Sequence, residues 1–330
     1  MTEIITSRRT ALVLGSALTA AALAPAFAAD EPVWSGEYWA QKGDVRLYLY
    51  RKRIGAPRAG ENKPVLFLVH GSSNSSRSSF DLTVPGKGEY SMMNAFARLG
   101  YDVWTMDHEG YGRSSRTAST SNIASGAADL LAAVPILQKE TGRSRYHFMG
   151  ESAGALRCGV FAQLHPDRVD RLVLSAVTYT GKGSPTLADR AKQTEFYRTT
   201  ARRPRGPEQI RSIFTRDKVE AYDMAVAEAM IAAEMPLGDE VPTGTYFDMT
   251  ANLPVLDPLK ITAPVLMTRG EYDGIATMAD LGEFFDKLPG GDKQFVILPA
   301  AAHVLALGIN RAQFWHAMHG FLSMPVGTRI

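Results

Sequence analysis

The sequence predicts an α/β protein whose mostly parallel sheet is covered by helices on both faces. Short apolar or aromatic runs alternate along the chain with longer segments whose apolar residues recur at helical spacing. This is the pattern of strands joined by helices. In addition, Pro64–Val69 is continuously apolar, as expected of a strand that is buried on both of its faces.

The individual elements follow from these two patterns. Aromatic, β-branched or apolar runs predict strands at Glu37–Ala40, Val45–Tyr50, Pro64–Val69, Tyr101–Met106, Ser144–Met149, Arg171–Ala176, Pro264–Thr268 and Gln294–Leu298. Helical spacing predicts helices at Met92–Leu99, Ile123–Lys139, Ala153–Leu164, Met278–Leu288 and Arg311–Phe321. The turn residues Lys42–Asp44 join the first two strands, and Gly142 ends the long second helix.

One region breaks this alternation. The 84 residues from Thr178 to Ile261 separate two consecutive expected strands, whereas ordinary connections are far shorter. The region is rich in helix formers around Leu187–Thr199 and Val219–Glu234, and prolines interrupt it. We therefore predict a helical cap inserted into the core domain.

The start of the chain resembles an export signal. Arg8 and Arg9 precede an alanine- and leucine-rich run from Ala11 to Ala24, and Ala26–Ala28 has the small residues of a cleavage site. Paired arginines favour the twin-arginine route, although that signal usually carries phenylalanine at the position of Ala11, so the general secretion route stays open. The apolar run is shorter than the about 20 residues that span a bilayer.

We therefore expect a periplasmic or secreted protein with no stable membrane anchor after cleavage. The predicted division is a signal peptide at 1–28, a first part of the core at 29–177, the cap at 178–261 and a second part of the core at 262–330. The net charge of +2 gives no indication of a nucleic-acid partner. The single cysteine, Cys158, excludes an internal disulfide framework, and we expect it to pack in the core.

The motif Gly150-Glu151-Ser152-Ala153-Gly154 lies between an expected strand and an expected helix. A serine on such a sharp turn takes a strained backbone, and its hydroxyl points out of the turn. The N–H groups at the start of the following helix point to the same place. Ser152 is therefore the candidate nucleophile, and the N–H of Ala153 is a candidate oxyanion donor.

Three further strand ends carry polar residues that complete this site. Ser72 follows the third strand and offers a second oxyanion N–H. Glu271 and Asp273 both follow Pro264–Thr268; we favour Asp273 as the acid because it lies deeper in the turn and precedes a glycine. Of the seven histidines, only His303 follows a strand downstream of Asp273, among small residues that leave room for its ring.

These residue types match the chemistry of nucleophilic catalysis. A serine hydroxyl is a poor nucleophile until a base takes its proton. A histidine accepts that proton, and a carboxylate holds the imidazole tautomer and stabilises the imidazolium. The chain order is Ser152, Asp273, His303, which differs from the orders in the two large serine protease folds.

From about Glu37 to Phe321 the chain resembles the α/β-hydrolase superfamily. The resemblance is carried by His70-Gly71, Asp107–Ser114, Gly150–Gly154, Gly270–Asp273 and His303. It implies an eight-stranded, mostly parallel sheet, a cap between the sixth and seventh strands, and no cofactor or metal. Gly-Glu-Ser-Ala-Gly looks like the turn of many carboxylesterases and lipases. However, His70-Gly71 lacks the extra glycines of the HGGG branch, and a serine at position 152 disfavours epoxide-hydrolase and dehalogenase chemistry.

We therefore expect an exported serine hydrolase that cleaves a small-molecule carboxylic ester. Two alternatives stay open: the same triad acting on an amide, a lactone or a carbon–carbon bond beside a ketone, or a homologue that binds a ligand without catalysis. Outside the triad, two polar stretches are expected to be solvated loops. These are the serines at Ser73, Ser75, Ser76, Ser78 and Ser79, and the arginines at Arg202, Arg203 and Arg205.

Overall fold

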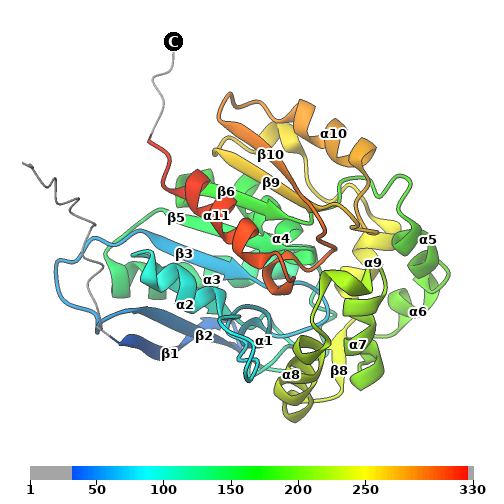
Figure 1. The fold of residues 1–330 in the computed structure, drawn as a ribbon, viewed down its shortest axis with the longest axis horizontal. Helices are drawn as coiled ribbons and strands as arrows, with labels where there is room; N and C mark the ends of the chain where they lie inside the picture. The colour runs from blue at the N-terminus through cyan, green and yellow to red at the C-terminus, as the bar shows by residue number, and fades with distance from the viewer. Residues whose placement is uncertain (1–31, 326–330) are drawn as a thin grey trace, which may run out of the picture. The chain divides into compact units, whose positions relative to one another are not determined.

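The computed structural model describes residues 32–325. They form an eight-stranded sheet in the order β1-β2-β4-β3-β5-β6-β9-β10 (Figure 1). β2 is antiparallel to both β1 and β4, and all other neighbouring strands are parallel. The strands are β1 (Val33–Lys42), β2 (Val45–Ile54), β3 (Val65–Val69), β4 (Asp102–Met106), β5 (Tyr146–Glu151), β6 (Val169–Ser175), β9 (Val265–Gly270) and β10 (Lys293–Leu298). The expected mostly parallel, eight-stranded α/β architecture is confirmed.

Strand β3 shows why its sequence is continuously apolar. Phe67 and Val69 contribute to the hydrophobic core on one face of the sheet, whereas Leu66 and Leu68 contribute to the core on the other face. Side chains alternate between the two faces of a strand. A central strand with helices on both sides therefore needs an apolar residue at every position.

Helices cover both faces of the sheet (Figure 1). One face packs against α3 (Ile123–Thr141), α4 (Ala153–Leu164) and α10 (Met278–Lys287), and the other packs against α1 (Ser76–Phe80), α2 (Met92–Arg98) and α11 (Arg311–Leu322). Local signals set the helix ends: the Asn122 side chain caps the first turn of α3, and Gly142 ends that helix at a φ of 70°. Apart from α1, these helices lie within a few residues of their expected bounds.

The inserted segment (residues 178–261) lies between β6 and β9 and is mostly helical. It contains α5 (Pro185–Ala191), α6 (Thr194–Thr199), β7 (Arg202–Pro204), α7 (Pro207–Thr215), α8 (Met224–Glu234), β8 (Glu240–Pro242) and α9 (Gly244–Ala251). β7 and β8 pair as a small antiparallel sheet. Phe214 of α7 and Met230 of α8 belong to an apolar cluster that also includes Val304 and Leu307, which follow β10. The inserted segment therefore packs over loops at the carboxyl ends of the parallel strands.

The serine-rich stretch after β3 is not the solvated loop that we expected. Ser75, Ser76 and Ser78 are each 3% exposed or less, and the stretch forms α1. Buried carboxylates hold it: Glu234 accepts hydrogen bonds from the hydroxyls of Ser75 and Ser78, and Asp107 accepts one from Ser76 at 2.6 Å. Serine hydroxyls can be buried in this way because each of them finds an acceptor.

The arginine cluster of the inserted segment is not a solvated loop either. Arg205 is 4% exposed and forms a buried ion pair with Glu234. Arg202 and Arg203 are half-buried in β7. Glu234 therefore links the end of α8 both to the residue that follows β7 and to the start of α1.

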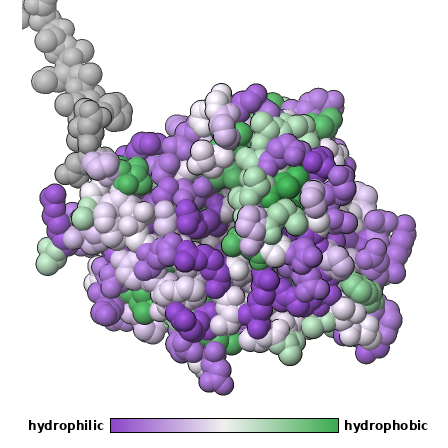
Figure 2. Space-filling model, turned by 90° about the horizontal axis from the view of Figure 1, so that it is seen from below, coloured by the Kyte–Doolittle hydropathy of each residue, from purple (hydrophilic) through white to green (hydrophobic). Residues whose placement is uncertain are grey.

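The predicted export signal lies outside the described residues. Within residues 32–325, no helix is both long enough and apolar enough to cross a membrane. The face of the molecule in Figure 2 is mostly hydrophilic, with apolar side chains in smaller groups between hydrophilic ones.

Candidate active site

Ser152 occupies a strained turn between β5 and α4. Its φ of 58° and ψ of −123° lie outside the regions that L-residues usually adopt. Close packing explains the flanking glycines. A β-carbon on Gly154 would lie 2.1 Å from the Val69 carbonyl oxygen, and one on Gly150 would lie 2.3 Å from the Gly154 carbonyl oxygen. The G-x-S-x-G pattern therefore lets this turn sit against β3, with the serine at the carboxyl edge of the sheet.

The loop after β3 approaches the same serine. A β-carbon on Gly71 would lie 3.3 Å from the Glu151 carbonyl oxygen, which is a tight contact, and 3.9 Å from Ser152 Oγ, so Gly71 packs directly against the turn that carries the serine. Among the described residues, neither the N–H of Ser72 nor that of Ala153 donates a hydrogen bond. Both donors are therefore available to a ligand.

Two tyrosine hydroxyls fix the orientation of Ser72. Tyr111 donates to the Ser72 carbonyl oxygen at 3.0 Å, and Tyr246 donates to the same oxygen at 3.4 Å. Holding the carbonyl orients the peptide groups of this loop. The sequence did not assign this role to either tyrosine, because they come from the turn after β4 and from α9 and no local pattern links them to the loop.

Asp273 and His303 form a buried pair. His303 Nδ1 lies 2.9 Å from Asp273 Oδ1, and the same carboxylate oxygen accepts the Ile275 N–H at 2.8 Å. Burial alone raises the pKa of Asp273, but the charge and hydrogen bond of His303 outweigh burial and lower that pKa below its ordinary value. Asp273 is therefore ionised at neutral pH and holds the Nδ1 side of the imidazole.

Glu271, the other carboxylate considered from the sequence, lies elsewhere. It is exposed, and it accepts the N–H of Ala300 at 2.8 Å. It makes no hydrogen bond with His303 in the described part of the chain. The structure thus brings together His303 and Asp273, but not His303 and Glu271.

Ser152 and His303 line the same small cavity of about 50 Å³, together with Gly71 and Ser72. No hydrogen bond joins Ser152 to His303 among the described residues. Catalytic hydrogen bonds are often long in the absence of substrate and tighten in the complex. Residues of the inserted segment also line this cavity: Arg190, Ile213, Phe214, Arg216 and Met230.

Glu151 is a titratable residue of this cavity that the sequence did not single out. It is 7% exposed, and its Oε2 accepts the Ala306 N–H at 3.4 Å. Burial raises its pKa to about 7, although the nearby His303 lowers that pKa in part. The only signal for this position was its place beside the serine in the motif, which says nothing of burial.

The two histidines in the strand-end turns support the loop that carries Ser72. His70 Nε2 accepts the His108 N–H at 3.1 Å, so Nδ1 carries the proton and donates to the Gly71 carbonyl oxygen at 2.8 Å. Burial lowers the pKa of both histidines well below the ordinary value. Within residues 32–325, no group of three or more His, Cys, Asp or Glu residues could hold a metal ion.

Solved structures share this architecture at low sequence identity. A hydrolase from Pseudomonas aeruginosa PA01 aligns with a TM-score of 0.62 and 19% identity over 88% of this chain and 99% of that one. An E-2-(acetamidomethylene)succinate hydrolase aligns with a TM-score of 0.62 and 18% identity over 88% and 100% of the two chains. The protein therefore has the α/β-hydrolase fold that the sequence motifs implied.

Two curated relatives match part of the chain. Both are named as 2-hydroxy-6-oxononadienedioate/2-hydroxy-6-oxononatrienedioate hydrolases. The one from Paraburkholderia phymatum is 31% identical over 141 residues, and the one from Burkholderia vietnamiensis is 30% identical over 138 residues. In each case the match covers 41% of this chain and 42% of the relative, so the chain spans less than half of their length.

A family model described as serine aminopeptidase, S33, matches residues 60–307, which is most of the chain. The match begins before β3 and includes Ser152, Asp273 and His303. The chain therefore belongs to the serine aminopeptidase S33 family of serine hydrolases, within the α/β-hydrolase superfamily.

Proposed function

We propose that the protein hydrolyses carboxylic esters through an acyl-enzyme on Ser152, with His303 as the base and Asp273 as its orienting acid. The observation that supports this most strongly is the position of His303. Its Nδ1 side is hydrogen-bonded to a buried carboxylate, and its ring lines the cavity that also holds Ser152. An imidazole held in this way can accept the proton of a serine hydroxyl.

In the first half of the reaction, Ser152 Oγ attacks the ester carbonyl carbon while its proton passes to His303 Nε2. The negative charge on the carbonyl oxygen is stabilised by the free N–H groups of Ser72 and Ala153. When the tetrahedral intermediate collapses, the bond to the alcohol oxygen breaks and His303 gives that oxygen the proton.

In the second half, a water molecule attacks the acyl carbon and His303 accepts a proton from it. The bond to Ser152 Oγ then breaks, and the proton on His303 returns to the serine. The products are one carboxylic acid and one alcohol. Asp273 stays ionised throughout and stabilises the imidazolium that forms twice in each cycle.

The test uses protein purified without its proposed signal peptide. It should release p-nitrophenol from a short p-nitrophenyl ester, and a fluorophosphonate should label Ser152 and abolish the activity. Ser152→Ala serves as the control and should be neither active nor labelled. A folded wild-type protein that turned over no ester, amide or lactone and resisted the label would instead favour a ligand-binding homologue without catalysis.

Cleavage of a carbon–carbon bond beside a ketone is the second candidate, and the two curated relatives favour it. The compounds in their names are dicarboxylates with a ketone and without an ester or amide bond, so their hydrolysis breaks a carbon–carbon bond. Matched ester, amide, lactone and vinylogous 1,5-diketone substrates would distinguish the candidates. The highest kcat/KM on the diketone would replace the ester proposal.

We also propose that the inserted segment acts as a cap that shapes the acyl pocket, and that the protein is exported. The cap role is supported by Phe214 and Met230, which line the cavity of Ser152. Export is supported by Arg8 and Arg9 before the apolar run. Fractionation of cells that express the full chain should place the protein in the periplasm or medium, and replacing both arginines with lysine should retain it inside if the twin-arginine route is used.

A further inference from the structure

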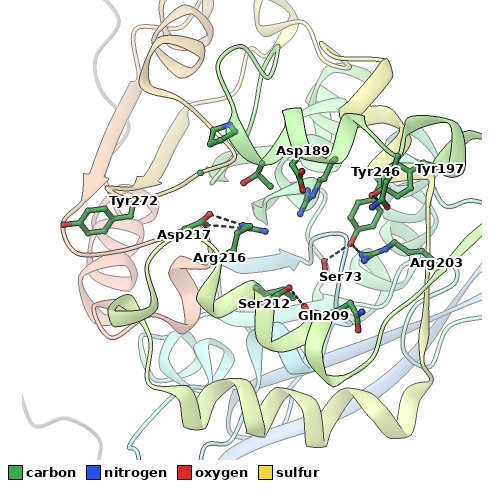
Figure 3. A pocket seen from close by; sticks show the side chains of 16 residues that line it. Ser73, Asp189, Tyr197, Arg203, Gln209, Ser212, Arg216, Asp217, Tyr246 and Tyr272 are labelled. Atoms are coloured by element: carbon green, nitrogen blue, oxygen red, sulfur yellow. Dashed lines mark hydrogen bonds and ion pairs between the residues drawn. The ribbon is translucent and has the colours of Figure 1, made fainter.

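A second, larger cavity of about 580 Å³ (Figure 3) adjoins the one that holds Ser152, because the two have lining residues in common. Four residues line both cavities: Ser73, Arg190, Ile213 and Arg216. Figure 3 shows side chains of the inserted segment around this space, together with Ser73 of the loop after β3 and Tyr272 of the loop after β9. The larger cavity is therefore placed to hold the part of a substrate that extends away from the reacting carbonyl.

The wall of this cavity contains three arginines and two aspartates. Asp217 pairs with the third arginine of the wall: both of its carboxylate oxygens accept hydrogen bonds from Arg216 at 3.0 Å. The other, Asp189, has an exposed side chain and pairs with Lys192 at 2.9 Å. Each acidic side chain of the wall thus already has a cationic partner.

The other two arginines, Arg190 and Arg203, have no carboxylate partner among the described residues. Arg203 donates to the Tyr246 hydroxyl at 2.9 Å, and Arg190 Nη1 is buried and has no hydrogen-bond partner within residues 32–325. Both guanidinium groups lie over the Tyr246 ring, at 5.3 Å for Arg190 and 4.7 Å for Arg203. Burial lowers the pKa of Arg190. Arg190 as a whole is half-buried and lines the cavity, but its Nη1 is out of reach of solvent. A buried donor of a charged group is costly to leave without an anionic partner.

Tyr246 contacts both the two arginines and the loop that carries Ser72. Its hydroxyl bonds to Ser73 Oγ at 2.8 Å and to the Ser72 carbonyl oxygen at 3.4 Å. The Tyr246 side chain would therefore lie between an anion bound by the two arginines and the loop that carries Ser72, the candidate oxyanion donor. The planar donors of a guanidinium match the geometry of a carboxylate.

We propose that Arg190 and Arg203 form a subsite for a carboxylate group of the substrate, whose scissile bond lies at Ser152. This inference rests on the proposed hydrolytic function, and it names the substrate class: esters of dicarboxylic acids that keep one free carboxylate. The subsite selects such substrates because a neutral acyl chain leaves the two guanidinium groups unpaired.

The first experiment compares p-nitrophenyl monoesters of glutaric, adipic and suberic acid with neutral p-nitrophenyl alkanoates of the same chain length. The readout is the ratio of kcat/KM for the anionic ester to that for the matched neutral ester. Arg190→Gln and Arg203→Gln should each lower this ratio on the order of 10- to 100-fold, the value of a hydrogen bond to a charged group. Arg198→Gln is the matched control, since Arg198 is exposed and pairs with Glu195.

A second experiment needs no turnover, so it separates failure of the subsite from failure of the proposed function. Monomethyl glutarate, monomethyl adipate and monomethyl suberate are titrated into Ser152→Ala by calorimetry, with the corresponding monoamides as neutral probes. The anionic series should contain a ligand that binds at least about 10-fold more tightly than its neutral counterpart. Adding Arg190→Gln to the Ser152→Ala protein should remove that preference.

Thermal melts show whether each variant folds. If Arg190→Gln does not fold, Arg203→Gln and the wild-type comparison of anionic with neutral esters still test the proposal. Equal kcat/KM for anionic and neutral esters in the wild type, together with equal binding in Ser152→Ala, would overturn it. A ratio that is unchanged in both folded arginine variants would also overturn it and leave the two arginines as packing partners of Tyr246.

Discussion

Asp273 Oδ1 lies 2.9 Å from His303 Nδ1, whereas Glu271, two residues earlier on the same loop, bonds to the Ala300 N–H at the surface. Asp273 and His303 are 4% and 5% exposed. The turn after β9 thus carries two carboxylates in very different environments. Of these two carboxylates, only Asp273 is placed to hold His303 in the tautomer that carries its proton on Nδ1.

Asp273→Asn should lower kcat by about 10⁴-fold, because an amide in place of the carboxylate stabilises the wrong imidazole tautomer. Glu271→Gln should change kcat much less, since its side chain bonds only to the loop. Both variants are compared on one activated ester, with folding checked by thermal melt. The reverse result, an inactive Glu271→Gln and an active Asp273→Asn, would exchange the two assignments.

Ser152→Ala and His303→Ala should each lower kcat by about 10⁴-fold or more, because members of a nucleophile–base pair act as a unit. For the same reason, the double variant should be little worse than either single one. Turnover of an activated ester by all three proteins measures this. If the loss of kcat in the double variant equalled the product of the two single losses, Ser152 and His303 would act independently.

The sequence predicted the elements that place the site because its signals there are local. The glycines around Ser152 are required by contacts within one strand–turn–helix unit and with the neighbouring β3. Parallel strands end at the same edge of a sheet, so residues just after them were expected to meet. The pairing of His303 with Asp273 agrees with that expectation.

Features that depend on distant partners were not predictable in this way. Ser75 looked solvated because its acceptor, Glu234, lies 159 residues later in the chain. Arg205 looked solvated for the same reason, since its partner Glu234 lies at the end of α8, 29 residues later in the chain. Polar residues carry no sequence signal for burial when their partners come from another element.

Glu234→Ala should lower the free energy of unfolding by about 3–5 kcal/mol, because it leaves Arg205 buried without its counter-ion and removes an acceptor from Ser75 and Ser78. Glu195→Ala is the control. Glu195 also pairs with an arginine, Arg198, but the pair is exposed, so stability should barely change. Urea unfolding measures both. A similar small effect for the two variants would mean that the buried pair contributes no more than the exposed one.

Glu151 lies beside Ser152 and has an ordinary pKa of 4.5 when unfolded, but burial raises its pKa in the folded protein to about 7. Between these two values the folded protein holds a proton that the unfolded chain has lost. The free energy of unfolding therefore falls as the pH rises through this window. The stability that the protonated Glu151 carboxyl contributes is fully present below the pKa of the unfolded chain, and it is lost once the pH exceeds the pKa of the folded protein.

Glu151→Gln removes this titration while keeping a polar side chain of similar size. As the pH rises from about 5 to about 8, the free energy of unfolding of the wild type should fall by about 2 to 3 kcal/mol more than that of the variant. The reason is that each unit of pKa shift corresponds to about 1.4 kcal/mol. Urea unfolding of both proteins at the two pH values measures the difference, and all other titrating groups are common to both. Stability curves that run parallel across this window would show that the Glu151 carboxyl titrates alike in the folded and unfolded chains, and would contradict the burial of an uncharged acid next to Ser152.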